Sequence, residues 1–291
     1  MSISTLQEIL ISAEAAHEPM WKIILQENCK EQNIPEEECF ENMRCMYRAM
    51  KNADRDYDAK LFSASGMSGG AGEKLHQYRV RQQTLLGDYL SLVVEKAVKM
   101  AESNACMKRI VAAPTAGSCG VIPAVLLAYE EMKKVQEEEL VKALLIAGGI
   151  GAVYAAHASI AGAEGGCQAE IGVASAMAAG AVAFLEGGDH ETILHAATLA
   201  MKSLLGLTCD PVAGLVEVPC IKRNASGAVN AVTAAQLALS GIQSAIPPDE
   251  VVDSMRRIGK LLPECLRETS LDGLAATKTG AEIRNRVSKT V

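Results

Sequence analysis

Aromatic residues are scarce in this chain of 291 residues. They make up 3% of the sequence, whereas hydrophobic residues of all kinds make up 49%. The interior must therefore be built from Ala, Val, Leu, Ile, Met and Gly, and bulky sheet-forming residues are few. The sequence also lacks any sustained alternation of apolar and polar residues, which is the pattern of a half-buried β-strand. Together, these absences predict an all-α fold.

The sequence also has no dense cluster of positive charge. It contains 28 Lys and Arg against 35 Asp and Glu, for a net charge of -7. No group of basic residues is dense enough to neutralise a row of phosphates. The first residues lack the positively charged n-region of a signal peptide. We therefore expect a cytoplasmic protein that does not bind nucleic acid.

One long run, residues 143–163, carries no formal charge and approaches the ~20 residues that span a bilayer. It contains His157 and several glycines, and it has more Ala than Leu or Ile. No aromatic belt marks a membrane interface at its ends. We expect a helix that is buried in the core of a soluble protein and does not contact a membrane.

The chain is long for one domain and short for two of average size. We expect residues 1–291 to form a single catalytic domain, in which residues 1–60 are a peripheral helical segment. The apolar periodicity predicts a compact bundle of about ten helices. Its buried central helices are rich in small residues and are expected at 141–159, 167–185, 190–206 and 219–240, with Asp189 as the cap of the third.

Two segments of small residues are expected to be loops. Residues 63–72, SASGMSGGAG, are too rich in Gly and Ser for the interior of an element. They fit a flexible linker and a ligand-contacting loop equally well. Residues 110–120, IVAAPTAGSCG, precede an apolar helix, so their backbone N–H groups and the Thr115 and Ser118 hydroxyls can bind an anion such as a carboxylate. The segment is not a P-loop, because the lysine of that motif is missing.

Nine cysteines in a reducing compartment act as small hydrophobes, metal ligands or nucleophiles rather than disulfides. Cys167, Cys209 and Cys220 lie in short segments framed by Gly, Ala and Pro. Three thiolates on one metal group leave a coordination position open for a substrate, as a Lewis-acid centre requires. The chain has no CxxC pair, so neither a zinc ribbon nor a ferredoxin pattern is present. The spacing alone predicts an iron-sulfur enzyme but leaves buried core thiols as an alternative.

Four segments carry a family resemblance. Residues 113–127, 157–180, 207–231 and 268–280 resemble the alpha chain of iron-sulfur-dependent L-serine dehydratase, and the likeness extends over essentially the whole chain. The resemblance implies that Cys167, Cys209 and Cys220 hold a 4Fe-4S cluster in a largely helical domain. It also implies that L-serine is converted to pyruvate and ammonia, beginning with loss of water. The iron without a cysteine ligand is expected to act as a Lewis acid on the substrate hydroxyl.

The residue that removes the α proton stays open. Five candidate bases are drawn from the matching segments, and burial can tune any of them to take a proton: His157, Glu164, Glu170, Lys222 and Lys278. We retain His157, Glu170 and Lys278 as candidate catalytic residues. The alternatives are that His157 is a hydrogen-bonded core histidine and that Lys222 and Arg223 pair with Glu164 or Glu170.

The substrate carboxylate is expected to bind at the two small-residue loops. The candidate binding residues are Ser65 and Gly66 in the first loop and Thr115, Ala116, Gly117 and Ser118 in the second. Lys278 is a candidate charge partner.

A second chain is also implied. Single-chain members of the family carry a further domain with a Ser-Ser-Ser-His-Thr stretch, and this sequence has no such stretch. Two-chain members place it on a separate beta subunit. We therefore expect the beta subunit of L-serine dehydratase as a partner, and little or no activity from this chain alone.

Three other functions compete with this interpretation. An L-cysteine desulfidase of the same superfamily would use the same cluster. A pyridoxal-phosphate dehydratase would need a lysine such as Lys222, but no phosphate-cradling Gly loop lies near it in the sequence. An iron-sulfur sensor or structural subunit would not need a Gly-rich pocket loop or a hydroxyl-bearing helix start.

Overall fold

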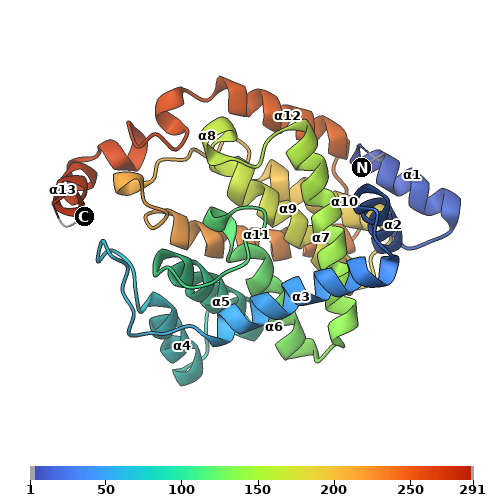
Figure 1. The fold of residues 1–291 in the computed structure, drawn as a ribbon, viewed down its shortest axis with the longest axis horizontal. Coiled ribbons are helices and arrows are strands. Elements are labelled where there is room, and N and C mark those ends of the chain that lie inside the picture. The colour runs from blue at the N-terminus through green and yellow to red at the C-terminus, as the bar shows by residue number, and fades with distance from the viewer. Residues whose placement is uncertain (1–3, 290–291) are drawn as a thin grey trace.

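The computed structural model describes residues 4–289 and has the predicted all-α architecture (Figure 1). In this part of the chain there are thirteen α-helices, and the only β pairing is an isolated bridge between Cys209 and Arg267. The number exceeds the prediction partly because short helices, such as the four-residue α8, have no readable apolar periodicity. The helices are α1 Leu6–Ala16, α2 Met20–Gln32, α3 Glu36–Arg55, α4 Ala71–Arg81, α5 Gly87–Ala105, α6 Val121–Lys133, α7 Glu137–His157, α8 Gly162–Gly165, α9 Val173–Leu185, α10 His190–Lys202, α11 Cys220–Leu239, α12 Pro248–Leu261 and α13 Lys278–Val287.

The central helix of the bundle is α9. It is buried from Val173 to Ala183 and contacts α6, α7, α10 and α11. The helices approach closely because the facing residues are small: a methyl group on Gly151 of α7 would lie 2.6 Å from Met177 Cε of α9. Glycine costs backbone entropy in a helix, so such a position is useful where two helices need the space. The prediction of small-residue-rich central helices is confirmed.

The predicted central helices have nearly the predicted ends. Asp189 caps α10 as expected, since its carboxylate accepts a hydrogen bond from Thr192 N at 2.8 Å. The helix ends at Lys202 rather than at residue 206, and α11 begins at Cys220 after Pro219. The helix predicted over 167–185 is interrupted: residues Gln168–Gly172 form a π-helical turn before α9 begins.

Two helical segments, Glu137–His157 and Gln168–Leu185, are long and apolar enough to cross a membrane. Within the fold, 67% and 83% of their most apolar windows are buried. Neighbouring helices therefore already cover most of this apolar surface. The burial agrees with the prediction of a core helix in the uncharged run, although the helix ends at His157.

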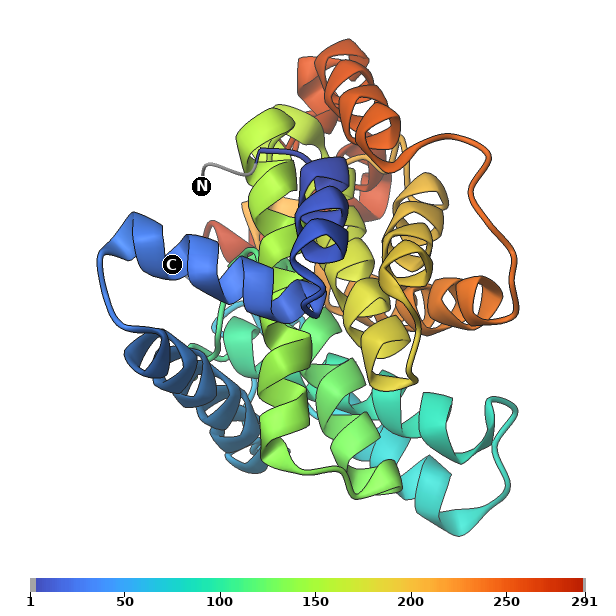
Figure 2. The same cartoon turned by 90° about the vertical axis from the view of Figure 1, so that its right-hand side faces the viewer.

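Helices α1–α3 lie on the outside of the bundle (Figures 1 and 2). Their inner faces nevertheless contribute to the main core through side chains such as Leu6, Ile9 and Tyr47. Both α2 and α3 pack against α7. This first part of the described chain therefore shares one hydrophobic core with the central helices.

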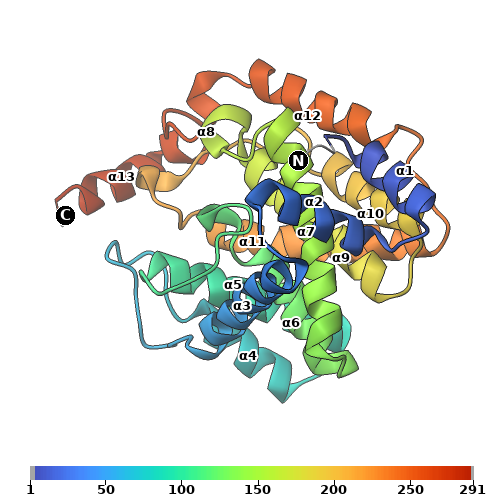
Figure 3. The ribbon, with the colours of Figure 1, turned by 45° about the vertical axis from the view of Figure 1, so that its right-hand side comes forward.

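Five connections gather on the side of the bundle that carries α13, away from α1 and α2 (Figures 1 and 3). Hydrogen bonds join several of them directly, including those from Ser65 to Glu217 and from Thr115 to Glu170. The connections are residues 56–70, 106–120, 158–172, 203–219 and 262–277. This end of the molecule contains the candidate functional residues of the sequence.

Candidate functional site

The structure brings the three cysteines together from three different elements. Cys167 immediately precedes the π-helical turn, Cys209 lies in the connection after α10, and Cys220 is the first residue of α11. All three are buried free thiols. Each interacts electrostatically with the other two, so the three sulfur atoms share one neighbourhood.

Burial dominates the acidity of these thiols. It raises the pKa of Cys167 to about 11 and that of Cys220 to about 12. Burial also raises the pKa of Cys209, and the neighbouring thiol of Cys167 adds to that rise. Without a metal the three groups are therefore protonated at neutral pH. A metal group that binds here must displace their protons, as is usual for thiolate ligands.

The donor set fits a cluster better than a single ion. Among residues 4–289, no three His, Cys, Asp or Glu side chains are grouped as the ligands of one metal ion. Thiolates on one tetrahedral ion, each at about 2.3 Å from it, would be about 4 Å apart. Thiolate sulfur is the ligand that iron-sulfur clusters use, so the chemistry of these three side chains fits such a cluster.

Arg223 ties the three cysteine segments to one another. Its guanidinium donates to Thr208 O at 2.8 Å and to Asp210 Oδ1 at 2.9 Å, on either side of Cys209. Its positive charge also opposes the rise in the pKa of the Cys167 thiol. This contact differs from the alternative in which Arg223 pairs with Glu164 or Glu170. The acid that reaches it comes from the loop next to Cys209.

Asn224 joins the second small-residue loop to the turn that carries Cys220. Its buried amide donates to Gly117 O at 2.8 Å and to Cys220 O at 3.0 Å, and its Oδ1 accepts from Gly120 N at 2.8 Å. Asn224 lies one helical turn after Cys220, so both residues occupy the same face of α11. That spacing is the sequence signal that could have identified it.

Glu170 lies in the π-helical turn and faces the loop of residues 115–118. Thr115 Oγ1 donates to Glu170 Oε1 at 2.7 Å. A methyl group on Gly117 would lie 2.7 Å from the same oxygen, so the close approach requires glycine there. Burial raises the pKa of Glu170, the Thr115 hydrogen bond partly offsets that rise, and the charge of Glu268 adds to it.

Glu170, Cys209 and Glu268 converge on one point above Gly162. A methyl group on Gly162 would lie 2.9 Å from Glu170 Oε2, 3.2 Å from Cys209 Sγ and 3.2 Å from Glu268 Oε2. Two carboxylates and one of the three thiols therefore surround this point, too closely for a methyl group to fit between them without a shift. Glu268 is not among the candidate site residues predicted from the sequence, although it is the first residue of the resembling segment 268–280.

The first small-residue loop is anchored rather than free. Ser63 Oγ and Ser65 Oγ donate to the two oxygens of the buried Glu217 carboxylate, at 2.6 and 2.8 Å. Glu217 lies three residues before Cys220, so the serine loop is tied to a cysteine segment. Gly66 has a φ of 70°, and a methyl group on it would meet no heavy atom within 4 Å. These bonds contradict the flexible-linker interpretation and leave Gly66 beside open space.

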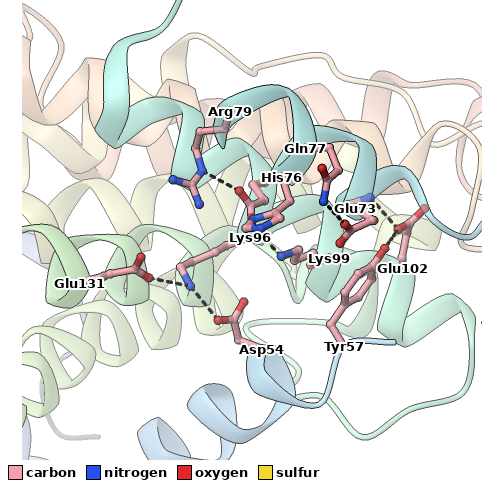
Figure 4. Close-up of polar contacts among 12 residues, drawn as sticks. Asp54, Tyr57, Glu73, His76, Gln77, Arg79, Lys96, Lys99, Glu102 and Glu131 are labelled. Carbon is pink, nitrogen blue, oxygen red and sulfur yellow. Dashed lines mark hydrogen bonds and ion pairs between the residues drawn. The ribbon is translucent and has the colours of Figure 1, made fainter. Parts of the chain in front are cut away.

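A network of buried charges holds the end of this loop and α4 in place (Figure 4). Glu102 accepts from Tyr57 Oη at 2.8 Å and from backbone N–H groups at the start of α4, including Gly72 N at 2.9 Å. Glu95 binds Arg79 at 2.7 Å and Lys99 at 2.6 Å. Burial disfavours the charged form of Glu95, but the hydrogen bonds from Lys99 and Arg79 outweigh it and lower the pKa.

Comparison with known proteins agrees with this geometry. The family described as the serine dehydratase alpha chain matches residues 15–275. This chain belongs to the serine dehydratase alpha-chain family.

Three relatives illustrate the range of the family. The L-serine dehydratase alpha chain of Peptoniphilus asaccharolyticus is 40% identical over 283 residues, which is 97% of each chain. A probable L-serine dehydratase alpha chain of Bacillus subtilis is 47% identical over 251 residues, 86% of this chain and 84% of the relative. An L-serine dehydratase of Escherichia coli is 48% identical over 181 residues, but these are 62% of this chain and only 40% of the relative.

Of the three candidate catalytic residues, only Glu170 lies within the cysteine neighbourhood. His157 is exposed at the end of α7 and lines a hollow of about 170 Å³ together with Asp249 and Arg256. Lys278 is exposed at the start of α13 and forms no ion pair among residues 4–289. Lys222, the lysine considered for a pyridoxal-phosphate enzyme, is exposed on α11.

Proposed function

We propose that this chain is the catalytic subunit of an L-serine dehydratase, which releases pyruvate and ammonia from L-serine. The names of relatives that match nearly the whole chain support the substrate. The observation that carries the proposal is the meeting of three buried thiols with the Glu170 carboxylate at one end of the bundle. A catalytic site needs an adjoining acid–base group, whereas a purely structural metal site does not.

Cys167, Cys209 and Cys220 would hold a 4Fe-4S cluster, with Arg223 as the fixed cation beside their thiolates. A cluster held by three cysteines supplies, when bound, a Lewis-acidic iron for the substrate hydroxyl, which makes hydroxide a better leaving group. The chain itself must supply the groups that bind the rest of the substrate and move its α proton.

We assign proton removal to Glu170. Its Oε1 is engaged by Thr115, so Oε2, which faces the space above Gly162, is the atom that accepts the α proton. Burial raises the pKa of this carboxyl toward the pH at which the enzyme works, which strengthens it as a base. The exposed positions of His157 and Lys278 favour Glu170 over them.

The loop of residues 115–118 is suited to the substrate carboxylate. Within residues 4–289, the backbone N–H groups of Ala116 and Gly117 donate to no protein acceptor. They lie next to Glu170, which contacts Gly117. We propose that these two N–H groups bind the carboxylate, that Thr115 and Ser118 fix the loop, and that Ser65 and Gly66 line the opposite side.

We propose that a separate beta subunit completes the site. Relatives of similar length are named alpha chains, and the match to the longer E. coli relative covers less than half of that protein. Large apolar side chains are exposed on the five connections on the α13 side of the bundle and at the end of α12: Phe62, Met107, Leu261, Leu271 and Leu274. This apolar rim is the surface on which we expect the beta subunit to dock. We also propose a cytoplasmic location, because a reducing environment keeps the cysteines as free thiols.

The test is an anaerobic assay of pyruvate release from L-serine and from L-cysteine, by this chain with and without its beta subunit. We expect turnover of serine by the pair and little from the alpha chain alone. The variant Cys209→Ser should lose turnover and the cluster absorbance while keeping its helical circular dichroism. Preference for cysteine would identify a desulfidase, and full activity of Cys209→Ser would refute the proposal.

A further inference from the structure

Glu268 has an unusual backbone that is fixed to a cysteine. Its φ of 64° lies in the left-handed region, which a residue with a side chain rarely occupies. Two hydrogen bonds hold this segment beside Cys209: Cys209 N donates to Leu266 O at 2.8 Å, and Glu268 N donates to Cys209 O at 2.7 Å. Such a conformation persists where the surroundings over-determine it, and it is often found at functional sites. The position of Glu268 is thus set relative to Cys209.

The Glu268 side chain extends toward the Glu170 carboxylate, above Gly162. Its Oε2 lies 3.2 Å from the point that a methyl group on Gly162 would occupy, and Glu170 Oε2 lies 2.9 Å from that point. The carboxylate belongs to an exposed residue, so a ligand from solvent can reach it. The two acids therefore approach each other above Gly162 from two different connections.

Glu268 differs from the other acids of the site in having no partner. Among residues 4–289, no side chain or backbone group donates a hydrogen bond to its carboxylate, and no cation pairs with it. Asp210, by contrast, accepts from Arg223 and from Leu274 N. Arg223 pairs with Asp210 and donates to Thr208 O, and within residues 4–289 no ion pair joins it to Glu268. An unpaired anion is left facing the site.

We infer that Glu268 binds the α-ammonium group of the substrate and selects amino acids over acids that lack this group; the inference rests on the function proposed above. L-Serine carries one positive charge, on the nitrogen attached to Cα. A carboxylate that accepts from an ammonium group forms a charge-assisted hydrogen bond, which is among the strongest available in proteins. The exposed, unpaired Glu268 suits this role. The half-buried Glu170, held by Thr115, suits proton transfer instead.

Two ligands that differ only in the ammonium group should bind with different affinities. L-Alanine and propionate share a carboxylate and a three-carbon skeleton, but only L-alanine carries the cation. The wild-type site should bind L-alanine more tightly, because Glu268 attracts the ammonium group and repels the carboxylate of a ligand that lacks it. Removing the charge of Glu268 should abolish most of this preference.

The experiment uses the cluster-loaded complex with the beta subunit, prepared without oxygen. Binding of L-alanine and of propionate is measured by calorimetry in the wild type, Glu268→Gln and Glu268→Asp. In Glu268→Gln we expect L-alanine to bind about 10- to 100-fold more weakly, the loss typical of a hydrogen bond to a charged group. Propionate should bind equally well or more tightly. Glu268→Asp should recover part of the affinity for L-alanine.

Turnover gives a second, independent measurement. Glu268→Gln should raise KM for L-serine by a similar factor with a smaller effect on kcat, and iron content and the visible spectrum should match the wild type. Glu264→Gln, an exposed acid four residues earlier in the same segment, is the matched control and should resemble the wild type.

The outcomes separate this inference from the proposed function. An unchanged preference for L-alanine over propionate in Glu268→Gln would overturn the role of Glu268. A loss confined to kcat would also overturn it and would make Glu268 a proton-transfer group. A wild-type complex that releases no pyruvate from serine would refute the function, while the binding measurement would still decide whether Glu268 recognises an ammonium group.

Discussion

Four acidic residues near the cysteines have the same chemical group but different surroundings. Asp210 and Glu217 each accept two hydrogen bonds from protein donors, so their carboxylates hold the loops together. Glu170 accepts one, from Thr115, and is otherwise available. Glu268 accepts none from residues 4–289. The two acids with the fewest hydrogen bonds from the protein, Glu170 and Glu268, are those that meet above Gly162.

Replacing Glu170 tests its assignment as the base. Glu170→Gln should lower kcat by about 10²- to 10⁴-fold, the usual contribution of a positioned base. In the wild type, kcat should fall as the pH drops through the raised pKa of Glu170, because the protonated carboxyl cannot accept a proton. A kcat for Glu170→Gln within a few-fold of the wild type would contradict the assignment.

The same variant has a predicted effect on stability. Because the folded-state pKa of Glu170 is raised, the folded protein loses stability as the pH rises above the usual carboxyl pKa. Glu170→Gln should therefore be as stable as the wild type or more stable at neutral pH, and this advantage should disappear at acid pH. Thermal unfolding at several pH values, with iron content as a check on cluster loading, measures both trends.

Gly162 lets the Glu170, Cys209 and Glu268 side chains approach one another closely. Gly162→Ala would place a methyl group where Glu170, Cys209 and Glu268 converge, so we expect turnover to fall by at least about tenfold through misplacement of these groups. Gly148→Ala is the control: its methyl group would meet Met43 Cε at an ordinary 3.8 Å, and in a helix the change should stabilise by about 0.5–1 kcal/mol. Equal activity of the two variants would argue against a substrate above Gly162.

Sequence reasoning identified some of these residues and missed others for physical reasons. The cysteines and Glu170 lie in segments whose composition and family resemblance mark them. The partners of Arg223 depend on how the Cys209 loop folds back, and this path is not encoded in local spacing. Glu268 becomes interesting only when its pairing with Cys209 and its approach to Gly162 are known.

At the scale of elements, the entry into α9 is a π-helical turn. Gln168 anchors the turn, since its side chain donates to Met255 O at 3.1 Å and accepts from Gly206 N at 2.9 Å. Wide turns of this kind are rare and often lie at functional sites. Apolar periodicity correctly predicted a helix here, but it cannot distinguish the wider turn, which depends on contacts with α12 and with the connection after α10.

The ion network between α4 and α5 gives a prediction about element stability. Glu95 is buried, and breaking a buried ion pair costs up to about 3 kcal/mol, less here because Arg79 and Lys99 are partly exposed. Glu95→Gln should therefore lower the free energy of unfolding. Since the pKa of Glu95 is lowered, this contribution is complete above the usual carboxyl pKa and is lost as the pH falls through the lowered value.

A control for Glu95 lies in a separate ion cluster nearby (Figure 4). Glu131 also pairs with a lysine, Lys96, but 55% of its side chain is exposed. Glu131→Gln should change the unfolding free energy by less than about 1 kcal/mol. Denaturant unfolding at neutral and acid pH compares the two variants, and equal effects at neutral pH would show that the burial of Glu95 does not set its contribution.

At the scale of the whole molecule, one core of small-residue helices supports an end formed by connections. The sequence predicted the core well, because buried helices leave a composition of Ala, Gly, Val and Leu. It could not predict how five connections meet, because each is short and lacks periodicity. The apolar rim around the cysteines is exposed in this chain, with Phe62 at 65% and Leu271 at 66%.

Leu271→Asp tests the rim as the docking surface of the beta subunit. A charge at the centre of an apolar interface should weaken binding of the beta subunit by tenfold or more. Leu85→Asp is the control, because Leu85 is equally apolar and even more exposed but lies in the connection between α4 and α5. Calorimetric titration of each variant with the beta subunit gives the affinities; wild-type affinity for Leu271→Asp would place the interface elsewhere.

The most direct test of the central claim is a crystal structure of the anaerobically prepared complex with an iron anomalous difference map. We predict one compact group of iron atoms that touches Sγ of Cys167, Cys209 and Cys220, beside the space lined by Glu170 and Glu268. Iron bound to other residues, or a map in which one of these three sulfur atoms does not contact the group, would contradict the account.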